Sequence, residues 1–267
     1  MKIEKIKLWE KAPGKCEETP YITAYVPNTA LGVTHKGAIV ILPGGGYTGR
    51  ANHEGMGFAE FFVTHGYTAF VVDYRVSPHE FPLPLLDARR AMRYVRHNAE
   101  KYGIDKDKIA IMGSSAGGHL AALTSTYTEK IDFEGVDEID NEDFIPNAQI
   151  LCYPVIELNT PICNVGSGQN LLGTRYETDA HKYIPSNLVT EKTPKAFIWH
   201  TFEDGAVDVR NSLNYASALK SKGVFSEMHI FPDGHHGKGL SIAEDKISKH
   251  IKKWSSLLLD WLEYNEF

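Results

Sequence analysis

One segment, residues 109–123, constrains the fold more than any other part of the chain. It reads IAIMGSSAGGHLAAL, an aliphatic run followed by G-x-S-x-G and then by residues that favour helix. At a sharp strand-to-helix bend the serine takes a strained backbone conformation, and the residues two before and two after it must be small because the chain packs against itself. Gly113 and Gly117 meet that requirement around Ser115. The segment therefore predicts a strand, a tight turn and a helix, with Ser115 at the turn as a candidate nucleophile.

Two alternatives to this interpretation stay open. A glycine-rich turn before a helix can bind a phosphate instead of carrying a nucleophile. Ser114 is a second hydroxyl, but with Ser114 as nucleophile the flanking pattern of small residues is lost. We therefore prefer Ser115, where the positive end of the following helix would favour an oxyanion.

The rest of the chain alternates strand and helix patterns. Residues 2–9 and 21–26 alternate in the strand period and predict an opening antiparallel pair. Further strands are expected at residues 37–42, 68–72, 108–112, 149–153, 196–200 and 227–231. Helices are expected at residues 55–65, 85–101, 211–222 and 246–262. The order predicts an α/β fold with a mostly parallel eight-stranded sheet, antiparallel N-terminal strands, and helices on both faces.

The length and composition are those of an ordinary globular domain. The chain has 267 residues, of which 42% are hydrophobic and 23% charged, and this favours a single domain over residues 1–267. Residues 127–144 are acidic and rich in turn formers, and residues 159–194 are long and weakly periodic. We expect both segments to be cap-like loops, because loops of this length in one domain tend to bind ligands or cover sites.

Charge gives no reason to expect a nucleic-acid partner. The net charge is −6, whereas a phosphate-binding surface would show clustered lysine and arginine. The exception is a basic run on one predicted helix, formed by Arg89, Arg90, Arg93 and Arg96. We interpret this run as a solvated helix face and not as a binding patch.

The cysteines and the absence of long apolar runs bear on location. Cys16, Cys152 and Cys163 are too few and too scattered for a disulfide framework or a C-x-x-C metal site, which favours a reducing compartment. The first residues lack the apolar core of a signal peptide, and no run reaches the ~18 apolar residues of a membrane helix. We therefore expect a soluble cytoplasmic protein that does not bind membranes.

A second glycine-rich segment follows the strand at residues 37–42. It reads PGGGY at residues 43–47, and three consecutive glycines let a backbone approach a ligand and turn its N–H groups inward. In an oxyanion hole the N–H of Ala116 would be one donor and Gly45 or Gly46 the others. The alternative is a glycine-rich turn that only joins a strand to a helix.

An acyl-transfer serine also needs a base and an acid that orients the base. After the strand at residues 196–200 the chain enters a polar turn, and Asp204 comes just past the strand end. Glu203 and Asp208 are competitors for the acid. After the last predicted strand, PDGHHG at residues 232–237 presents a histidine before the final helix. We prefer His236 as the base, with His235 as its competitor.

With these residues identified, the chain resembles the acetyl-xylan-esterase-like branch of the α/β-hydrolases, near the hormone-sensitive-lipase-like esterases. The matching motifs are LPGGGY (42–47), VDYR (72–75), DARRA (87–91), YVR (94–96), GSSAGGHLA (113–121), YPVI (153–156), NLLG (170–173), TP (193–194), HT (200–201) with Asp204, and GHHG (234–237). The resemblance implies an α/β-hydrolase fold, a Ser115–His236–Asp204 triad, and residues 43–46 as the oxyanion loop. Members of this group often deacetylate sugars or xylo-oligosaccharides.

Two departures from the family pattern concern substrate preference. Glu203 replaces the first of a frequent Asp-Asp pair, and Lys238 takes a position where an aromatic residue is common. Neither belongs to the triad, but Lys238 comes close to the base in sequence.

These observations predict a serine carboxylesterase that acts on small, acetyl-type esters, including O-acetylated sugars or xylo-oligosaccharides. Its partner is a small-molecule ester, and the chemistry requires no metal or organic cofactor. A peptidase on the same fold and a catalytically inactive binding member are the alternatives. A glycosidase is less favoured, because that reaction needs two carboxylates facing one bond. The sequence does not fix the oligomeric state, so a homodimer stays open.

Overall fold

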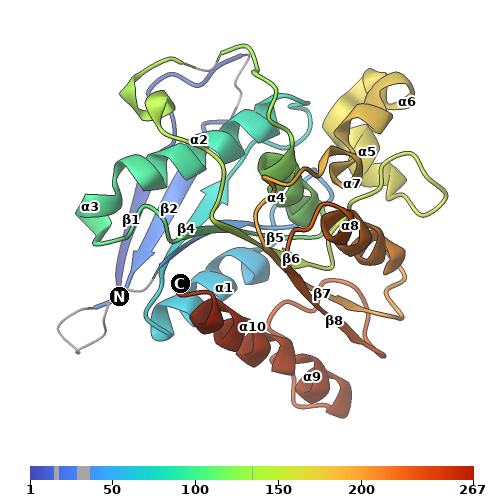
Figure 1. Cartoon of the computed structure of the whole chain (residues 1–267). Coiled ribbons are helices and arrows are strands. Elements are labelled where there is room, and N and C mark those ends of the chain that lie inside the picture. Colours follow the sequence, from blue (N-terminus) through green and yellow to red (C-terminus); the bar gives the residue numbers. More distant parts are fainter. Residues whose placement is uncertain (15–17, 29–36, 134) are drawn as a thin grey trace.

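The sheet at the centre of the computed structural model has eight strands in the order β1-β2-β4-β3-β5-β6-β7-β8 (Figure 1). The structure describes residues 1–14, 18–28, 37–133 and 135–267. The strands are β1 (Lys2–Lys7), β2 (Tyr21–Val26), β3 (Ala38–Leu42), β4 (Thr68–Asp73), β5 (Ile109–Ser114), β6 (Ala148–Cys152), β7 (Ala196–Thr201) and β8 (Ser226–Phe231). Strand β2 runs antiparallel to both β1 and β4, and all other neighbours are parallel. The predicted α/β fold with an opening antiparallel pair is confirmed.

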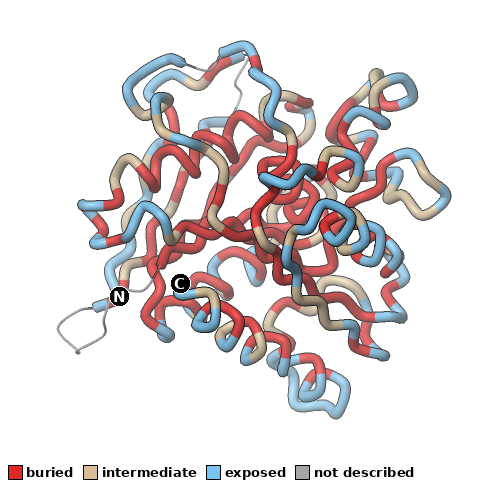
Figure 2. Tube along the Cα trace, in the orientation of Figure 1, coloured by how far each residue is buried: buried red, intermediate tan, exposed pale blue. Residues whose placement is uncertain are grey.

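Helices cover both faces of this sheet. They are α1 (Asn52–Thr64), α2 (Leu83–His97), α3 (Ala99–Tyr102), α4 (Ala116–Thr126), α5 (Val165–Leu172), α6 (Tyr176–Asp179), α7 (Pro185–Leu188), α8 (Arg210–Ser221), α9 (Lys246–Ile251) and α10 (Lys253–Tyr264). Helices α1 and α10 pack on one face, and α2, α4 and α8 on the other. Strands β3, β5, β6 and β7 are buried along their whole length as a result, whereas the edge strand β1 is largely exposed and the edge strand β8 is mostly half-buried (Figure 2). The continuous apolar runs of the four central strands are what burial on both faces requires.

Two predicted helices are each divided in the structure. Residues 85–101 form α2 and α3, and residues 246–262 form α9 and α10. The first break falls at Asn98, whose side-chain amide donates to the carbonyl of Tyr94 at 2.9 Å. An asparagine side chain competes in this way with the backbone hydrogen bonds that would continue the helix.

The long segment at residues 159–194 is more regular than its sequence indicates. It holds α5, α6, α7 and two short 3₁₀ turns, and α7 lies beside α4 and α8 (Figure 1). None of these pieces exceeds eight residues, so none produces a clear helical period in the sequence. In the described part of residues 127–144, which leaves out residue 134, the regular structure is one 3₁₀ turn, Glu138–Asn141.

The interpretation of the basic run on α2 as a solvated face is wrong. Arg89 and Arg90 are 0% and 2% exposed, and Arg93 and Arg96 are each 8% exposed. The reason is the acidic segment that follows α4, which folds over α2 and receives the guanidinium groups. Because its acceptors lie about 40 to 50 residues away in sequence, a helical-face analysis of α2 alone could not find them.

Arg90 shows how these arginines are accommodated. Its Nη2 donates to Asp137 at 2.6 Å and its Nη1 to Asp140 at 2.9 Å, while its guanidinium carbon lies 4.7 Å from the centre of the Trp9 ring. Buried arginine is tolerated where planar hydrogen bonds and aromatic stacking replace water. The run is therefore a structural anchor between α2, the N-terminal strands and the segment at residues 127–144.

Other sequence-level expectations concern cysteines and membranes. Cys152 and Cys163 are free thiols, and Cys16 lies outside the described residues. Over the ranges that the structure describes, no helix has the length and apolar character to cross a membrane.

Candidate active site

The strand, turn and helix predicted for residues 109–123 are present, and Ser115 stands between the end of β5 and the start of α4. Its backbone has φ +52° and ψ −120°, a conformation that costs free energy for a residue with a side chain. Two hydrogen bonds hold the bend: the Ser115 amide donates to Cys152, and its carbonyl accepts from Val155, each at 3.0 Å. The rigid turn presents the half-buried Ser115 hydroxyl at the carboxyl edge of the sheet.

Close packing explains the two glycines of the motif. A Cβ atom added at Gly113 would lie 2.1 Å from the Gly117 carbonyl oxygen, and one added at Gly117 would lie 2.1 Å from the Leu42 carbonyl oxygen. No side chain fits at such distances, because the obstacles are backbone atoms. The same contacts bring the end of β3, and hence the loop at residues 43–47, against the start of α4.

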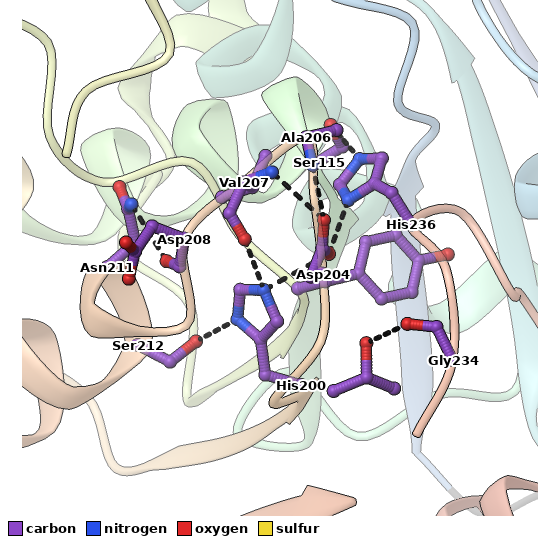
Figure 3. A network of polar contacts seen from close by, with 12 residues as sticks. Ser115, His200, Asp204, Ala206, Val207, Asp208, Asn211, Ser212, Gly234 and His236 are labelled. Atoms are coloured by element: carbon purple, nitrogen blue, oxygen red, sulfur yellow. Dashed lines mark hydrogen bonds and ion pairs between the residues drawn. The ribbon is translucent and has the colours of Figure 1, made fainter. Parts of the chain in front are cut away.

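Three residues from distant parts of the chain meet at this turn (Figure 3). Nε2 of His236 lies 2.8 Å from Oγ of Ser115, and Nδ1 of His236 lies 2.6 Å from Oδ2 of Asp204. Both distances are within hydrogen-bond reach, as a nucleophile with its base, and a base with the carboxylate that orients it, would require. His236 comes from the loop after β8, and Asp204 from the loop after β7. The structure thus brings together the three residues preferred from the sequence.

Asp204 is held as a carboxylate by several donors. Its Oδ1 accepts from the amides of Ala206 and Val207, each at 2.9 Å, and its Oδ2 faces His236 and His200. Burial alone would raise the pKa of Asp204, but the hydrogen bonds from His200, His236 and the Val207 amide outweigh it and hold that pKa well below its usual range. A charged Asp204 fixes the proton of His236 on Nδ1, which leaves Nε2 free to accept from Ser115.

His200 is a second imidazole on the same carboxylate, and its link to Asp204 was not predicted. Its Nε2 lies 3.0 Å from the Val207 carbonyl and 3.2 Å from Oδ2 of Asp204, and its Nδ1 lies 2.8 Å from the Ser212 hydroxyl (Figure 3). Two acceptors at Nε2 place the proton there, so Nδ1 accepts from Ser212. His200 is therefore held by hydrogen bonds on both of its ring nitrogens.

The competing residues have other surroundings. Glu203 and His235 are exposed. The Asp208 carboxylate accepts from Arg210 at the surface, and Ser114 is 1% exposed at the end of β5.

The glycine loop lies directly beside Ser115. A Cβ atom at Gly44 would come within 3.0 Å of Cβ of Ser115. Gly45 and Gly46 have φ of +142° and +61°, and the Gly45 carbonyl closes a tight turn by accepting from the amides of Thr48 and Gly49. Ala116 is the first residue of α4, so its amide has no carbonyl one turn earlier in the helix to bond. The amides of residues 45, 46 and 116 therefore stay the predicted oxyanion donors.

Two buried residues beside this loop were missed by sequence reasoning. Glu54 accepts from the Gly44 amide at 2.8 Å and from the Tyr153 hydroxyl at 2.6 Å. An acid in the first turn of a helix is ordinarily explained by the helix dipole. Glu54 therefore gave no sign of a further role in the sequence, although it lies on the apolar face of α1. The only signal for Tyr153 was its place in the YPVI motif.

The segment at residues 159–194 reaches the site through two asparagines. Asn170 donates to the Gly46 carbonyl at 2.8 Å, and Asn164 donates to the Ala206 carbonyl at 3.0 Å. The first bond holds the glycine loop and the second holds the loop of Asp204. These two bonds connect the segment to both loops, and its role as a binding loop stays a prediction.

The next question is whether side chains of the described residues could bind a metal ion. Among the residues with described positions, no group of three or more histidines, cysteines and acids is arranged to hold a metal ion.

His119, on the helix behind Ser115, makes the stability of the folded protein depend on pH. It is fully buried between the Tyr47 hydroxyl at 2.8 Å and the Tyr183 carbonyl at 2.9 Å, and burial lowers its pKa to about 4. In the unfolded chain a histidine has a pKa of about 6.5. Between these values the unfolded state binds a proton that the folded state does not, so stability falls as the pH falls. The loss between pH 6.5 and 4 should be about 3 kcal/mol.

Urea unfolding at pH 7 and pH 4.5 measures this effect. We expect the wild-type protein to lose more stability on acidification than His119→Gln, which cannot take up the proton. His181→Gln removes an exposed histidine and serves as the control, with the same pH dependence as wild type. An equal loss in wild type and His119→Gln would contradict the assignment.

Comparison with known proteins gives consistent matches. The BD-FAE family model matches residues 24–219. Endo-1,4-beta-xylanase B of Butyrivibrio fibrisolvens is 34% identical over 85% of this chain and 35% of its own length. The acetylxylan esterase of Xylanibacter ruminicola is 32% identical over 81% of this chain and 45% of its own. The chain thus spans less than half the length of these two curated relatives.

Solved structures match over nearly the whole chain. An acetyl ester-xyloside bifunctional hydrolase from Caldicellulosiruptor lactoaceticus is 38% identical, with a TM-score of 0.89 over 98% of this chain and 96% of that one. A carboxylesterase from Lactobacillus plantarum is 26% identical, with a TM-score of 0.81 over 99% and 98% of the two chains.

Proposed function

The chain belongs to the BD-FAE family of the α/β-hydrolase superfamily, and from this premise we propose that it is a serine carboxylesterase that hydrolyses small, acetyl-type esters. Ser115 is the proposed nucleophile, His236 the base and Asp204 the acid that orients the base. The observation that carries the proposal is the imidazole of His236, which bridges the Ser115 hydroxyl and the Asp204 carboxylate at 2.8 and 2.6 Å.

The first half-reaction is acyl transfer to the serine. Oγ of Ser115 attacks the ester carbonyl carbon while its proton passes to Nε2 of His236. The negative charge that develops on the carbonyl oxygen is stabilised by the amides of Ala116 and of Gly45 or Gly46. One such donor is worth about 3 kcal/mol in comparable sites. The tetrahedral intermediate then collapses, and the proton on Nε2 goes to the leaving alcohol.

The second half-reaction frees the acid. A water molecule loses its proton to Nε2 of His236 and attacks the acyl-enzyme carbonyl, and the proton returns to Oγ of Ser115 as the ester bond to the serine breaks. Asp204 stays ionised throughout and stabilises the imidazolium in both halves. Besides the ester and one water molecule, these steps use side chains and backbone amides of this chain.

Relatives support the substrate class. The Xylanibacter protein is an acetylxylan esterase, and the Caldicellulosiruptor protein acts as an acetyl ester-xyloside hydrolase. We therefore propose O-acetyl groups on sugars or xylo-oligosaccharides as the substrate. We also propose a reducing, cytoplasmic location, which is supported by two free thiols and is tested by cell fractionation.

A substrate panel tests this proposal. We expect p-nitrophenyl acetate and acetylated xylo-oligosaccharides to be turned over with a higher kcat/KM than p-nitrophenyl octanoate. Each surplus methylene that does not fit an acyl pocket costs about 1–3 kcal/mol, so the octanoate should be slower by tenfold or more, roughly. A p-nitrophenyl xyloside belongs in the panel because the Caldicellulosiruptor protein is bifunctional.

The panel also separates the alternatives. Cleavage of peptides at rates comparable to the acetyl esters would favour a peptidase. Absence of turnover together with absence of fluorophosphonate labelling at Ser115 would favour an inactive binding member. Either result would contradict the esterase proposal.

A further inference from the structure

A buried carboxylate connects the loop of the proposed oxyanion donors to the loop of the proposed base. Glu54 lies in the first turn of α1 and is 3% exposed. Its Oε2 accepts from the Gly44 amide at 2.8 Å, and its Oε1 accepts from the Tyr153 hydroxyl at 2.6 Å. Gly44 directly precedes the two glycines whose amides are the expected donors, so a hydrogen bond that holds Gly44 restricts where those amides can lie.

Tyr153 extends the connection to His236. Its hydroxyl accepts from the amide of Gly239, three residues after His236, at 3.0 Å. Its ring lies edge-to-face against the His236 ring, with centroids 5.0 Å apart and an angle of 70° between the planes. The Gly239 carbonyl accepts from the Trp254 indole at 3.1 Å, which holds the next peptide, after the Gly239 Cα. The base loop is therefore tied through one hydroxyl to Glu54.

We propose that Glu54 is a positioning residue for ester hydrolysis, holding through Gly44 and Tyr153 the oxyanion amides and the base in one geometry around Ser115. This inference rests on the proposed esterase function and names a further residue that the reaction needs. A buried carboxylate is costly unless its acceptor sites are satisfied. Within the described ranges, its one ion-pair partner within 4 Å is His53, at 3.8 Å, whose side chain is 59% exposed. Ion pairing therefore does not account for the burial, whereas the two hydrogen bonds do.

The chemistry of the two donors explains why the residue is an acid. An amide N–H and a phenol O–H converge on Glu54, and a carboxylate accepts with both oxygens. Burial, together with the charge of Glu54, raises the pKa of Tyr153 well above its ordinary value, so the hydroxyl keeps its proton and stays a donor. Glutamine has the same shape but one acceptor oxygen. Its NH₂ group would face either the Gly44 amide, as a second donor, or the Tyr153 hydroxyl, whose O–H would then lose its acceptor.

A double-mutant cycle tests the proposal with p-nitrophenyl acetate, kcat and KM being measured separately. We expect Glu54→Gln to lower kcat by roughly 10- to 100-fold with little change in KM, because small displacements of catalytic groups cost about that much. Tyr153→Phe removes the competing hydroxyl donor. In that background the glutamine carbonyl can turn to Gly44, so Glu54→Gln should cost less than in the wild-type background.

Controls separate positioning from folding. Glu60→Gln changes an exposed acid on the same helix and should leave kcat unchanged. Melting temperatures are measured for every variant, and the assays are run well below the lowest of them. The rate of Ser115 labelling by a fluorophosphonate should fall with kcat in Glu54→Gln and recover partly in the double variant.

The possible outcomes are distinct. Wild-type kcat in Glu54→Gln, or an equal cost of that change in both backgrounds, would overturn the role of Glu54 while leaving the esterase proposal intact. A wild-type protein that neither hydrolyses the ester nor takes the label overturns both. A lower kcat with partial recovery in the double variant supports the coupling through Tyr153.

Discussion

Replacing Ser115 with alanine is expected to lower kcat/KM for p-nitrophenyl acetate by roughly 10⁴-fold or more while the fold persists. Without Oγ no acyl-enzyme forms, and the remaining groups can only position water and stabilise the oxyanion. The bend itself should persist, because the two hydrogen bonds that hold it come from the Ser115 backbone amide and carbonyl. Kinetics and a thermal melt on the same preparation measure both parts of the expectation.

Ser114→Ala is the matched control for this change. It removes a hydroxyl one residue away, at the buried end of β5. We expect Ser114→Ala to keep the activity and the fluorophosphonate labelling of the wild-type protein, and Ser115→Ala to lose both. Retained hydrolysis in Ser115→Ala would contradict Ser115 as the nucleophile. Loss of hydrolysis and labelling in Ser114→Ala alone would assign that role to Ser114.

Much of the fold and the central part of the site could be predicted because their signals are local. The strands at the sheet centre are continuous apolar runs, and the bend at Ser115 requires glycines at fixed spacing on either side. His236 and Asp204 could be chosen because parallel strands bring the loops after β7 and β8 to the same edge as Ser115. Each of these inferences used a short window plus the known geometry of a parallel sheet.

What could not be predicted depends on contacts between residues far apart in the sequence. The arginines of α2 carry the spacing of a solvated face, but acceptors in residues 127–147 bury them. Glu54 is an ordinary first-turn acid until the Gly44 amide and the Tyr153 hydroxyl meet it, 10 and 99 residues away in sequence. Buried polar residues are the hardest to assign from sequence because their partners define them.

Asp204→Asn is expected to lower kcat by about 10⁴-fold. The amides of Ala206 and Val207 would keep the asparagine oxygen as their acceptor, which turns its NH₂ group toward His236. That group donates to Nδ1, so the imidazole proton moves to Nε2. The protonated Nε2 can then no longer accept the proton of the Ser115 hydroxyl. The negative charge that stabilises the imidazolium is lost at the same time.

Asp204→Asn should also change how the free energy of unfolding depends on pH. The pKa of Asp204 is held below its ordinary value in the folded protein, so the ionised form stabilises the fold above pH 4, roughly, and that contribution fades as the pH falls further. The difference in free energy of unfolding between wild type and Asp204→Asn should therefore be largest near neutral pH and shrink in acid. Urea unfolding at several pH values measures it.

Asp208→Asn provides the control, because this rival acid pairs with Arg210 at the surface and should leave kcat near the wild-type value. The double variant Ser115→Ala, Asp204→Asn should be no less active than Ser115→Ala alone, because residues that act as one unit are not additive. A large loss of kcat in Asp208→Asn, with a small one in Asp204→Asn, would show that Asp208 and not Asp204 orients the base. A further loss in the double variant would mean that Asp204 acts apart from Ser115 and His236.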